Sequence, residues 1–254
     1  MRPPWIPKPP IPMPEPAQPR LHRTPQASLK GEKVDTFVIA GHTLKLHRPT
    51  EPDQLLDDPF VEEAFHADEY LPYWAELWPS AQMLAEAILR DPRPFPAGTR
   101  TLEIGCGLGL VGSAAAAAGL DITLTDYDLT ALEFARKNAT TNAAAGCRPK
   151  VMPLDWRSPP AERYPLILGA DLLYEERAVA PLLGLLQACL EPGGEAWITD
   201  PDRKNGKLFG ARASELGMVL EARLTHAFEP DGKRIEGTLY RLALPDSGRI
   251  KPHV

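Results

Sequence analysis

From residue 99 onward, the chain alternates between two hydrophobic patterns. Short apolar runs that end at acidic residues or glycine predict strands, and the segments that follow them have the spacing of amphipathic helices. Strands that alternate with helices indicate right-handed crossovers and a parallel sheet that is buried on both faces. The pattern therefore predicts a doubly wound α/β fold. The strand runs are RTLEIG, DITLTD, KVMPLD, PLILGAD and EAWITD, at 100–105, 121–126, 150–155, 165–171 and 195–200.

Two hairpins flank this alternating region. The runs VDTFVIA and TLKLHRP predict an N-terminal β-hairpin at 34–48. Two strand-like runs near the C-terminus, at 218–228 and 234–244, have no helix between them and predict an antiparallel hairpin. We expect these strands to complete a mainly parallel, seven-stranded sheet. Further helices are expected at about 79–90 and 206–216.

Composition indicates one domain with appendages. The chain has 254 residues, of which 43% are hydrophobic and 24% are charged, as in ordinary globular proteins. Ten of its 29 prolines fall within the first 25 residues, where they would interrupt helices and sheet ladders. We therefore expect a Pro-rich disordered tail at 1–28, an N-terminal extension at 29–70, a main domain at 71–246 and a short tail at 247–254.

Charge and cysteine usage exclude several classes of protein. A net charge of −6 argues against a binder of duplex nucleic acid, which normally has a basic footprint. Cys106, Cys147 and Cys189 lack paired spacing, and the histidines are scattered, so neither disulfides nor a metal site is expected. No apolar run has the length of a membrane span, and prolines interrupt any signal-peptide core. A cytoplasmic location is expected.

The strongest local signal is LEIGCGLGLVG, at a predicted strand-to-helix junction. Gly105, Gly107 and Gly109 would let the backbone turn tightly and let a ligand approach closely. The spacing from Gly107 to Gly112 also fits a dinucleotide fingerprint, with Asp126 near the usual position of a ribose-binding acid. The glycine loop alone leaves the cofactor open.

Glu103 distinguishes between the two cofactors that fit this loop. A dinucleotide would place a pyrophosphate at the helix N-terminus, where a nearby carboxylate is unfavourable. S-adenosylmethionine (AdoMet) has no phosphate, and its ammonium group suits an acid. Glu103 therefore favours AdoMet. An alternative is that Glu103 binds backbone N–H groups and holds the loop, and the two roles can coexist.

Two acidic strand ends fit the nucleoside part of such a ligand. Asp126 ends the second strand and can accept hydrogen bonds from both ribose hydroxyls, since Asp128 is the better candidate for the following helix cap. Asp155 and Trp156 end the third strand, where the acid can bind the adenine amino group and the indole can cover the ring. The alternative for Asp155 and Trp156 is a surface turn with a partly buried tryptophan.

Asp171 and Tyr174 end the fourth strand, beside the first, where strand order reverses and α/β sheets bind ligands. The alternative is that Asp171 caps a helix near 175–177 and that Tyr174 packs on the core. The charged run at 201–204 follows the fifth strand toward the same side. It is either a substrate contact or a solvated loop.

These motifs together resemble a family. EIGCGLG, LTDYD, LDW and GADLLY look like a seven-stranded class I AdoMet-dependent methyltransferase with a Rossmann-like fold. ELWP, LDW and the Asp-x-x-Tyr motif more narrowly resemble the methyltransferase 16 family of protein lysine methyltransferases. Within it, PYWAELWPSAQMLAEAIL is most like the enzymes that modify the β-subunit of electron transfer flavoprotein and their bacterial relatives. The resemblance covers roughly residues 70–244.

The resemblance implies AdoMet as cofactor and a protein lysine as methyl acceptor. The tail and the hairpin at 34–48 lie outside the shared core, so they leave the choice of substrate open. The resemblance also implies that Glu103, Gly105, Gly107 and Gly109 surround the methionine part, that Asp126 binds the ribose, that Asp155 and Trp156 contact adenine, that Trp78 closes over the cofactor, and that Asp171 and Tyr174 line the acceptor channel.

We therefore expect an AdoMet-dependent methyltransferase that N-methylates a lysine side chain of a protein. Asp171 would orient the amine, and Tyr174 would supply an aromatic wall and a hydroxyl. The acidic body suits a basic protein surface. A small-molecule N-methyltransferase, a non-catalytic AdoMet-fold protein and a nicotinamide-dependent oxidoreductase are the alternatives. The last lacks support because Glu103 opposes it and no Tyr-x-x-x-Lys pair is found.

Overall fold

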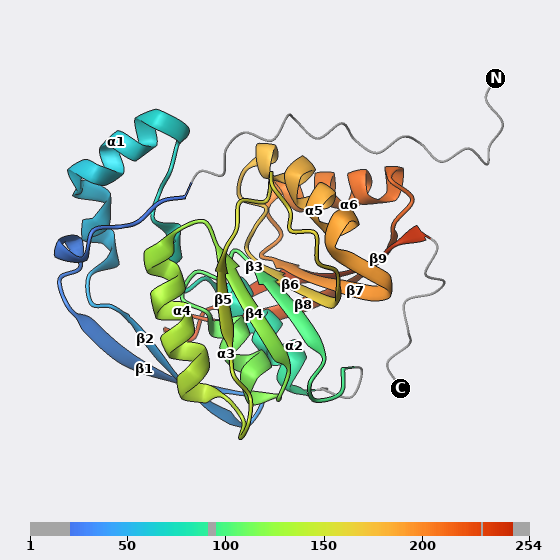
Figure 1. Cartoon of the computed structure of the whole chain (residues 1–254), viewed down its shortest axis with the longest axis horizontal. Coiled ribbons are helices and arrows are strands. Elements are labelled where there is room, and N and C mark those ends of the chain that lie inside the picture. The colour runs from blue at the N-terminus through green and yellow to red at the C-terminus, as the bar shows by residue number, and fades with distance from the viewer. Residues whose placement is uncertain (1–20, 91–94, 230, 246–254) are drawn as a thin grey trace.

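A seven-stranded sheet lies at the centre of the computed structural model, which describes residues 21–90, 95–229 and 231–245. Its strands are β3 (Arg100–Ile104), β4 (Asp121–Asp126), β5 (Lys150–Pro153), β6 (Tyr164–Ala170), β7 (Leu190–Asp200), β8 (Val219–Phe228) and β9 (Arg234–Ala243). The strand order is β5-β4-β3-β6-β7-β9-β8 (Figure 1). The first five are parallel, whereas β9 is antiparallel to both of its neighbours. The predicted doubly wound sheet and C-terminal hairpin are confirmed.

Helices cover both faces of this sheet. Alternate residues of β6 show why: Leu166 and Leu168 pack with α2, α3 and α4, while Ile167 packs with α5 and α6. Both sets are fully buried, as in other parallel sheets, so hydrophobic burial holds the strand in place from both sides. The helices are α2 (Pro79–Arg90), α3 (Leu110–Ala117), α4 (Leu129–Asn142), α5 (Val179–Cys189) and α6 (Lys204–Glu215).

The predicted N-terminal hairpin is also confirmed. Strands β1 (Glu32–Ile39) and β2 (His42–Pro49) form a separate two-stranded antiparallel sheet beside α4 (Figure 1). Asn138 on α4 binds the backbone of His47 twice: its Oδ1 accepts from the N–H at 2.7 Å, and its Nδ2 donates to the carbonyl at 2.8 Å. These bonds fix the hairpin on the main domain.

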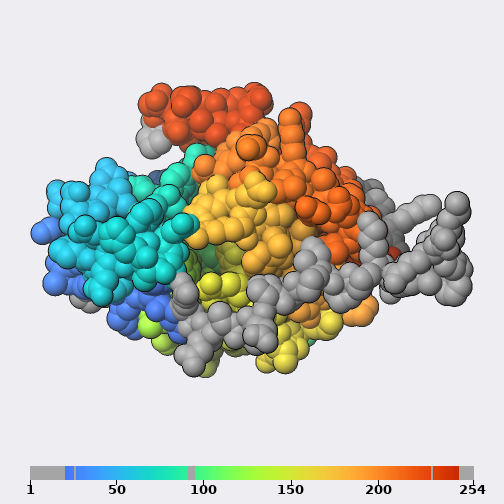
Figure 2. All heavy atoms as spheres, turned by 90° about the horizontal axis from the view of Figure 1, so that it is seen from above, coloured from blue at the N-terminus to red at the C-terminus, as the bar shows by residue number. Residues whose placement is uncertain are grey.

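The segment between this hairpin and α2 is acidic and mostly helical. It contains η2 (Pro52–Asp57), α1 (Pro59–Asp68) and η3 (Tyr73–Ala75). Asp58 caps α1, because its side chain accepts a hydrogen bond from the N–H of Phe60. In the space-filling view this cyan segment lies beside the yellow segment that follows β6 (Figure 2).

Residues 21–28 correct the expectation of a disordered tail that extends to residue 28. The N–H of His22 donates to the carbonyl of Tyr127, and its carbonyl accepts from Leu129, both at 2.9 Å. A short helix, η1 (Gln26–Ser28), follows. Residues 1–20, including the rest of the predicted tail, and residues 247–254 lie outside the described residues.

Thr24 explains why this stretch is held. Its side chain is fully buried, and its hydroxyl donates to Asp128 at 3.0 Å and accepts from the indole of Trp74 at 3.2 Å. A buried hydroxyl with partners stabilises a segment that has no hydrophobic periodicity, which is why its pattern gave no signal. In the part of the chain that the structure describes, no helix has both the length and the hydrophobicity to span a membrane.

Candidate active site

A cavity of about 680 Å³ lies at the carboxyl ends of β3, β4 and β6, where strand order reverses. Its other wall comes from the N-terminal segment around η3. The structure brings all ten residues that the sequence singled out to the lining of this one cavity: Trp78, Glu103, Gly105, Gly107, Gly109, Asp126, Asp155, Trp156, Asp171 and Tyr174.

At two positions of the glycine loop, a side chain would meet close neighbours. Gly105 has a φ of +61°, and a Cβ there would lie 2.7 Å from Leu172 and 3.1 Å from the ring of Trp156. At Gly109, a Cβ would lie 2.8 Å from the Cα of Ala135 on α4. Gly105 thus lets the loop approach Trp156, whereas Gly109 lets α3 and α4 approach each other.

Asp126 holds this loop from the end of β4. Its Oδ2 accepts a hydrogen bond from the N–H of Gly107 at 2.9 Å, and its Oδ1 accepts from the N–H of Asp128 at 3.0 Å. Burial raises the pKa of Asp126 to about 6. Asp128 caps α4 by accepting from Thr130 and Ala131, as the sequence analysis expected. Asp126 is therefore left facing the cavity.

Glu103 is the unusual group of the site. It is 2% exposed, and its Oε2 has no hydrogen-bond partner among the described residues. The backbone N–H of Gly112 lies near the carboxylate and favours its ionised form, which is compatible with the loop-holding alternative. Burial raises the pKa of Glu103 well above its usual range, and the nearby Asp126 raises it further. A buried carboxylate oxygen without a donor is unfavourable unless a ligand supplies one.

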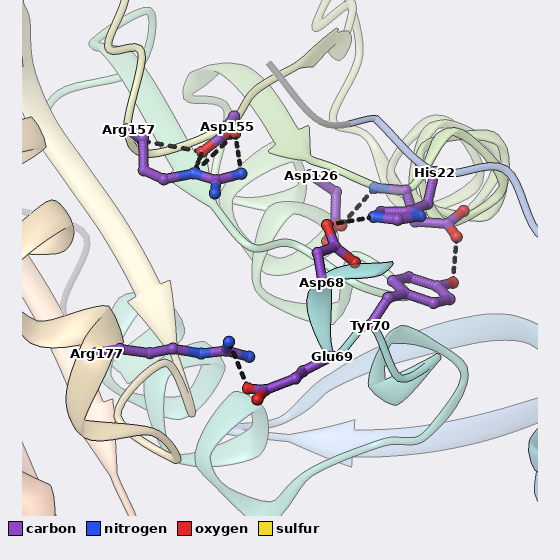
Figure 3. A network of polar contacts seen from close by, with 9 residues as sticks. His22, Asp68, Glu69, Tyr70, Asp126, Asp155, Arg157 and Arg177 are labelled. Atoms are coloured by element: carbon purple, nitrogen blue, oxygen red, sulfur yellow. Dashed lines mark hydrogen bonds and ion pairs between the residues drawn. The ribbon is translucent and has the colours of Figure 1, made fainter. Parts of the chain in front are cut away.

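Asp155 is paired with a neighbouring arginine. It forms a two-pronged ion pair with Arg157, with 2.8 Å from Nε to Oδ1 and 2.5 Å from Nη2 to Oδ2 (Figure 3). Arg157 was not among the predicted site residues, although a bidentate pair of arginine and carboxylate is a strong interaction. Trp156 is partly buried next to Gly105. Trp156 thus lines the cavity, and the Asp155 carboxylate already has a side-chain partner.

Asp171 sits in a left-handed backbone conformation, with a φ of +57°, and is 7% exposed. Its N–H donates to the carbonyl of Thr199 at 2.9 Å, and its Oδ1 accepts from Nε of Arg203 at 2.7 Å. Its Oδ2 is buried and has no partner among the described residues. The alternative of a helix cap is wrong, because no side chain caps the short helix η4 (Glu176–Ala178). Strain at a buried acid is common at functional sites.

Tyr174 lies beside η3. Its ring meets that of Tyr73 edge to face, at 5.3 Å between centroids, and 37% of the residue is exposed. Trp78 donates its indole N–H to the carbonyl of Tyr73 at 3.0 Å, and the guanidinium of Arg203 lies 5.7 Å from the Trp78 ring centroid. Tyr73 was missed because a single aromatic residue in a loop carries no spacing signal.

One ion pair joins the two walls of the cavity. Nη1 of Arg177, in η4, lies 2.5 Å from a carboxylate oxygen of Glu69, which follows α1 (Figure 3). Both side chains are exposed, so the pair contributes little to stability. Neither residue was predicted, since their contact spans more than a hundred residues of sequence. Within residues 21–90, 95–229 and 231–245 there is no cluster of His, Cys, Asp and Glu that could hold a metal ion.

Comparison with solved structures shows the fold. A glycopeptide N-methyltransferase solved with S-adenosyl-L-methionine aligns with a TM-score of 0.52 at 15% identity, over 64% of this chain and 94% of that chain. Magnesium protoporphyrin IX methyltransferase from Synechocystis PCC 6803 also aligns with a TM-score of 0.52, at 16% identity, over 73% of this chain and 85% of that chain. The Rossmann-like methyltransferase fold is thereby confirmed.

Curated relatives are more similar in sequence. EEF1A lysine methyltransferase 3 of Mus musculus is 33% identical over 51% of this chain and 56% of its own length. The electron transfer flavoprotein beta subunit lysine methyltransferase of Danio rerio is 31% identical over 65% and 61%, respectively. The chain thus spans less than two thirds of the length of these relatives. A family model described as lysine methyltransferase matches residues 73–208, which is more than half of the sequence, and this confirms the resemblance. The chain therefore belongs to the lysine methyltransferase family.

Proposed function

We propose that this chain is an AdoMet-dependent methyltransferase that N-methylates a lysine side chain of a protein. The observation that carries the proposal is the buried, unpartnered oxygen of Glu103 at the glycine loop. An ammonium group is a donor that can satisfy such an oxygen, and the methionine end of AdoMet has one. A pyrophosphate at the same place would face the carboxylate with like charge.

The remaining residues fit the same ligand. Asp126 faces the cavity with both oxygens held by backbone N–H groups, so its remaining lone pairs can accept from ribose hydroxyls. Trp156 offers a ring face beside Gly105 for a nucleobase. Arg157 holds Asp155 in place and adds donors at the same edge. These residues support the assignment of a nucleoside site to this part of the cavity.

The chemistry needs alignment more than activation. When bound, AdoMet supplies a methyl group on a sulfonium centre; its S–CH₃ bond breaks as a bond to the acceptor nitrogen forms, S-adenosylhomocysteine remains, and the proton of the new ammonium leaves to water. The acceptor must be neutral, whereas the amine of a solvated lysine side chain has a pKa of about 10.4. The free Oδ2 of Asp171 can accept an N–H of this amine and orient its lone pair.

Aromatic side chains line the path of the acceptor. Tyr174 and Tyr73 form a wall of this path, and Trp78 lies beside Tyr73. Their rings would exclude water from the reacting atoms and accommodate the aliphatic stem of a lysine. The hydroxyl of Tyr174 adds a hydrogen-bond group to the same wall.

A protein is the acceptor that the surroundings favour. The segment 51–76 carries nine acidic residues and no lysine or arginine, and most of residues 68–76, at its end, line the cavity. Such a surface attracts the basic surroundings of a target lysine. The relatives named above are lysine methyltransferases of proteins, which supports the same class. Cys106, Cys147 and Cys189 are all unpaired, which supports a cytoplasmic, reducing location.

The test is methyl transfer from radiolabelled AdoMet to a lysate of the source organism, divided into protein and small-molecule fractions. We expect label on protein, at lysine by mass spectrometry, with wild-type chain and none with Asp171→Ala. Label only in the small-molecule fraction would show a small-molecule N-methyltransferase. If calorimetry detects no binding of AdoMet or S-adenosylhomocysteine, or detects tighter binding of NAD, the proposal is wrong.

A further inference from the structure

Arg203 lies at the cavity, although the sequence analysis left its charged run as either a solvated loop or a substrate contact. It precedes α6, lines the cavity, and donates from Nε to Oδ1 of Asp171 at 2.7 Å. Its guanidinium stands over the ring of Trp78 at 5.7 Å. One arginine thus contacts both the acid at the end of β6 and the tryptophan before α2.

The turn that carries Arg203 is held from several sides. The backbone N–H of Arg203 donates to Oδ1 of Asp200 at 2.6 Å. The preceding residue, Asp202, has a φ of +57°, and its side chain accepts from the hydroxyl of Thr238 on β9 at 2.7 Å. The cation–π contact with Trp78 restrains the other end of the side chain. Arg203 is therefore fixed in position before any substrate arrives.

The ion pair with Arg203 changes how Asp171 affects the protonation state of a bound amine. A buried carboxylate alone would attract a lysine as its ammonium form and hold the proton on it, which opposes transfer. A carboxylate already paired with a guanidinium has little net charge, so it can accept one N–H without favouring the ammonium. Arg203 uses only Oδ1, and Oδ2 is buried without a partner among the described residues, so it has the capacity to accept a hydrogen bond from an amine.

We infer that Arg203 is a positioning residue for methyl transfer: it fixes the Asp171 carboxylate with Oδ2 toward the acceptor and offsets its charge, so that the bound amine loses its proton more readily. The inference rests on the proposed function. Besides Arg203, Asp200 on β7 interacts electrostatically with Asp171, and Asp200 also interacts with Asp202 in the following turn. Arg203 interacts with Tyr73 of η3. Tyr174 and Glu175, in the loop after β6, interact with each other.

The test compares Arg203→Gln, which removes the charge, with Arg203→Lys, which keeps it. The control is Arg212→Gln, an arginine on α6 that pairs with Glu215 at the surface. The rate of label transfer to the lysate protein fraction is measured between about pH 6.5 and 9.5. In Arg203→Gln, we expect kcat/KM to begin its rise at a pH about one unit higher than in the wild type. Arg203→Lys and the control should have the same pH dependence of kcat/KM as the wild type. The affinity for S-adenosylhomocysteine should change by less than about twofold in all variants.

A second measurement needs no methyl acceptor. Calorimetry with n-butylamine, an analogue of the lysine side chain, is carried out at neutral pH with S-adenosylhomocysteine present. Arg203→Gln should bind this cation about tenfold more tightly than wild type, because the charge of Asp171 is no longer offset. The inference would be overturned if the pH dependence of kcat/KM or the affinity for n-butylamine were unchanged in Arg203→Gln. It would also be overturned if Arg203→Lys changed either quantity as much as Arg203→Gln does. If wild-type chain labels nothing, the proposed function fails, while the n-butylamine comparison still tests Arg203.

Discussion

Tyr73 and Tyr174 meet edge to face, with ring centroids 5.3 Å apart and ring planes at 72°. Tyr73 belongs to η3 and Tyr174 to the loop after β6, so a single aromatic contact joins the N-terminal segment to the motif at the strand end. This contact links the position of the acceptor wall to the packing of a segment that lies outside the sheet.

Two substitutions of Tyr174 should distinguish the contribution of its ring to methyl transfer from that of its hydroxyl. Tyr174→Ala removes the wall and should lower kcat for methyl transfer by about 100-fold, since small misplacements at a reacting centre have effects of that size. Tyr174→Phe keeps the contact with Tyr73 and should lower kcat by about tenfold or less. The affinity for AdoMet, measured by calorimetry, should change less than about threefold in both. Equal losses in the two variants would show that the ring contributes nothing.

Glu103→Gln should shift stability and affinity in opposite directions. The pKa of Glu103 is raised in the folded state, so ionisation of this group destabilises the fold. The free energy of unfolding should therefore decrease as pH rises and Glu103 loses its proton. The amide removes this penalty, and the melting temperature of the ligand-free variant should rise at mildly alkaline pH. The affinity for AdoMet should fall about tenfold or more, because the acceptor of its ammonium loses its charge. Glu86→Gln, at an exposed pair on α2, is the control. Unchanged affinity in Glu103→Gln would remove the basis of the proposed cofactor site.

Thr24→Val tests the anchoring of residues 21–28. The valine is nearly isosteric but leaves the indole N–H of Trp74 without its partner and removes a donor to Asp128. The free energy of unfolding in urea should fall by about 1–3 kcal/mol. Thr43→Val, at an exposed position of β2, should change it by less than about 0.5 kcal/mol. Equal free energies of unfolding for the two variants would mean that residues 21–28 are not anchored to the main domain in solution.

Asp200→Asn should flatten part of the pH dependence of stability. Burial raises the pKa of Asp200 to about 6, against about 3.9 in an unfolded chain. The folded state therefore holds a proton that the unfolded state has lost, and the wild type loses stability between about pH 4 and pH 6. The asparagine can still accept from the N–H of Arg203, so the variant should gain stability over the wild type across this window. Parallel curves of unfolding free energy against pH would contradict the assignment.

The sheet and the acids at its edge could be predicted because they follow from local pattern. A strand such as β6 is apolar on both faces, which indicates a parallel sheet, and parallel strands place their carboxyl ends at one edge. The distinction between Asp126 and Asp128 also came from local rules, since a helix cap has a fixed position relative to its helix.

Contacts between distant segments could not be predicted in this way. The bond between Arg203 and Asp171 spans 32 residues, and that between Thr24 and Asp128 spans 104. Neither belongs to a repeating pattern, because isolated side-chain hydrogen bonds leave no periodicity in the sequence. The proline-rich composition around Thr24 favoured disorder, and tertiary hydrogen bonds overrode it.

Asp128 serves two parts of the molecule at once. Its Oδ1 accepts from two N–H groups at the start of α4, and its Oδ2 accepts from Thr24 and Tyr70. Its own N–H binds Asp126, which holds the glycine loop. In a mutational scan, variants at Asp128 would thus lose cellular abundance and ligand affinity together, although Asp128 is not among the residues that line the cavity. Screens that score growth or product alone would therefore identify this scaffold acid as a ligand contact, whereas a parallel measurement of protein level would reveal the loss of abundance.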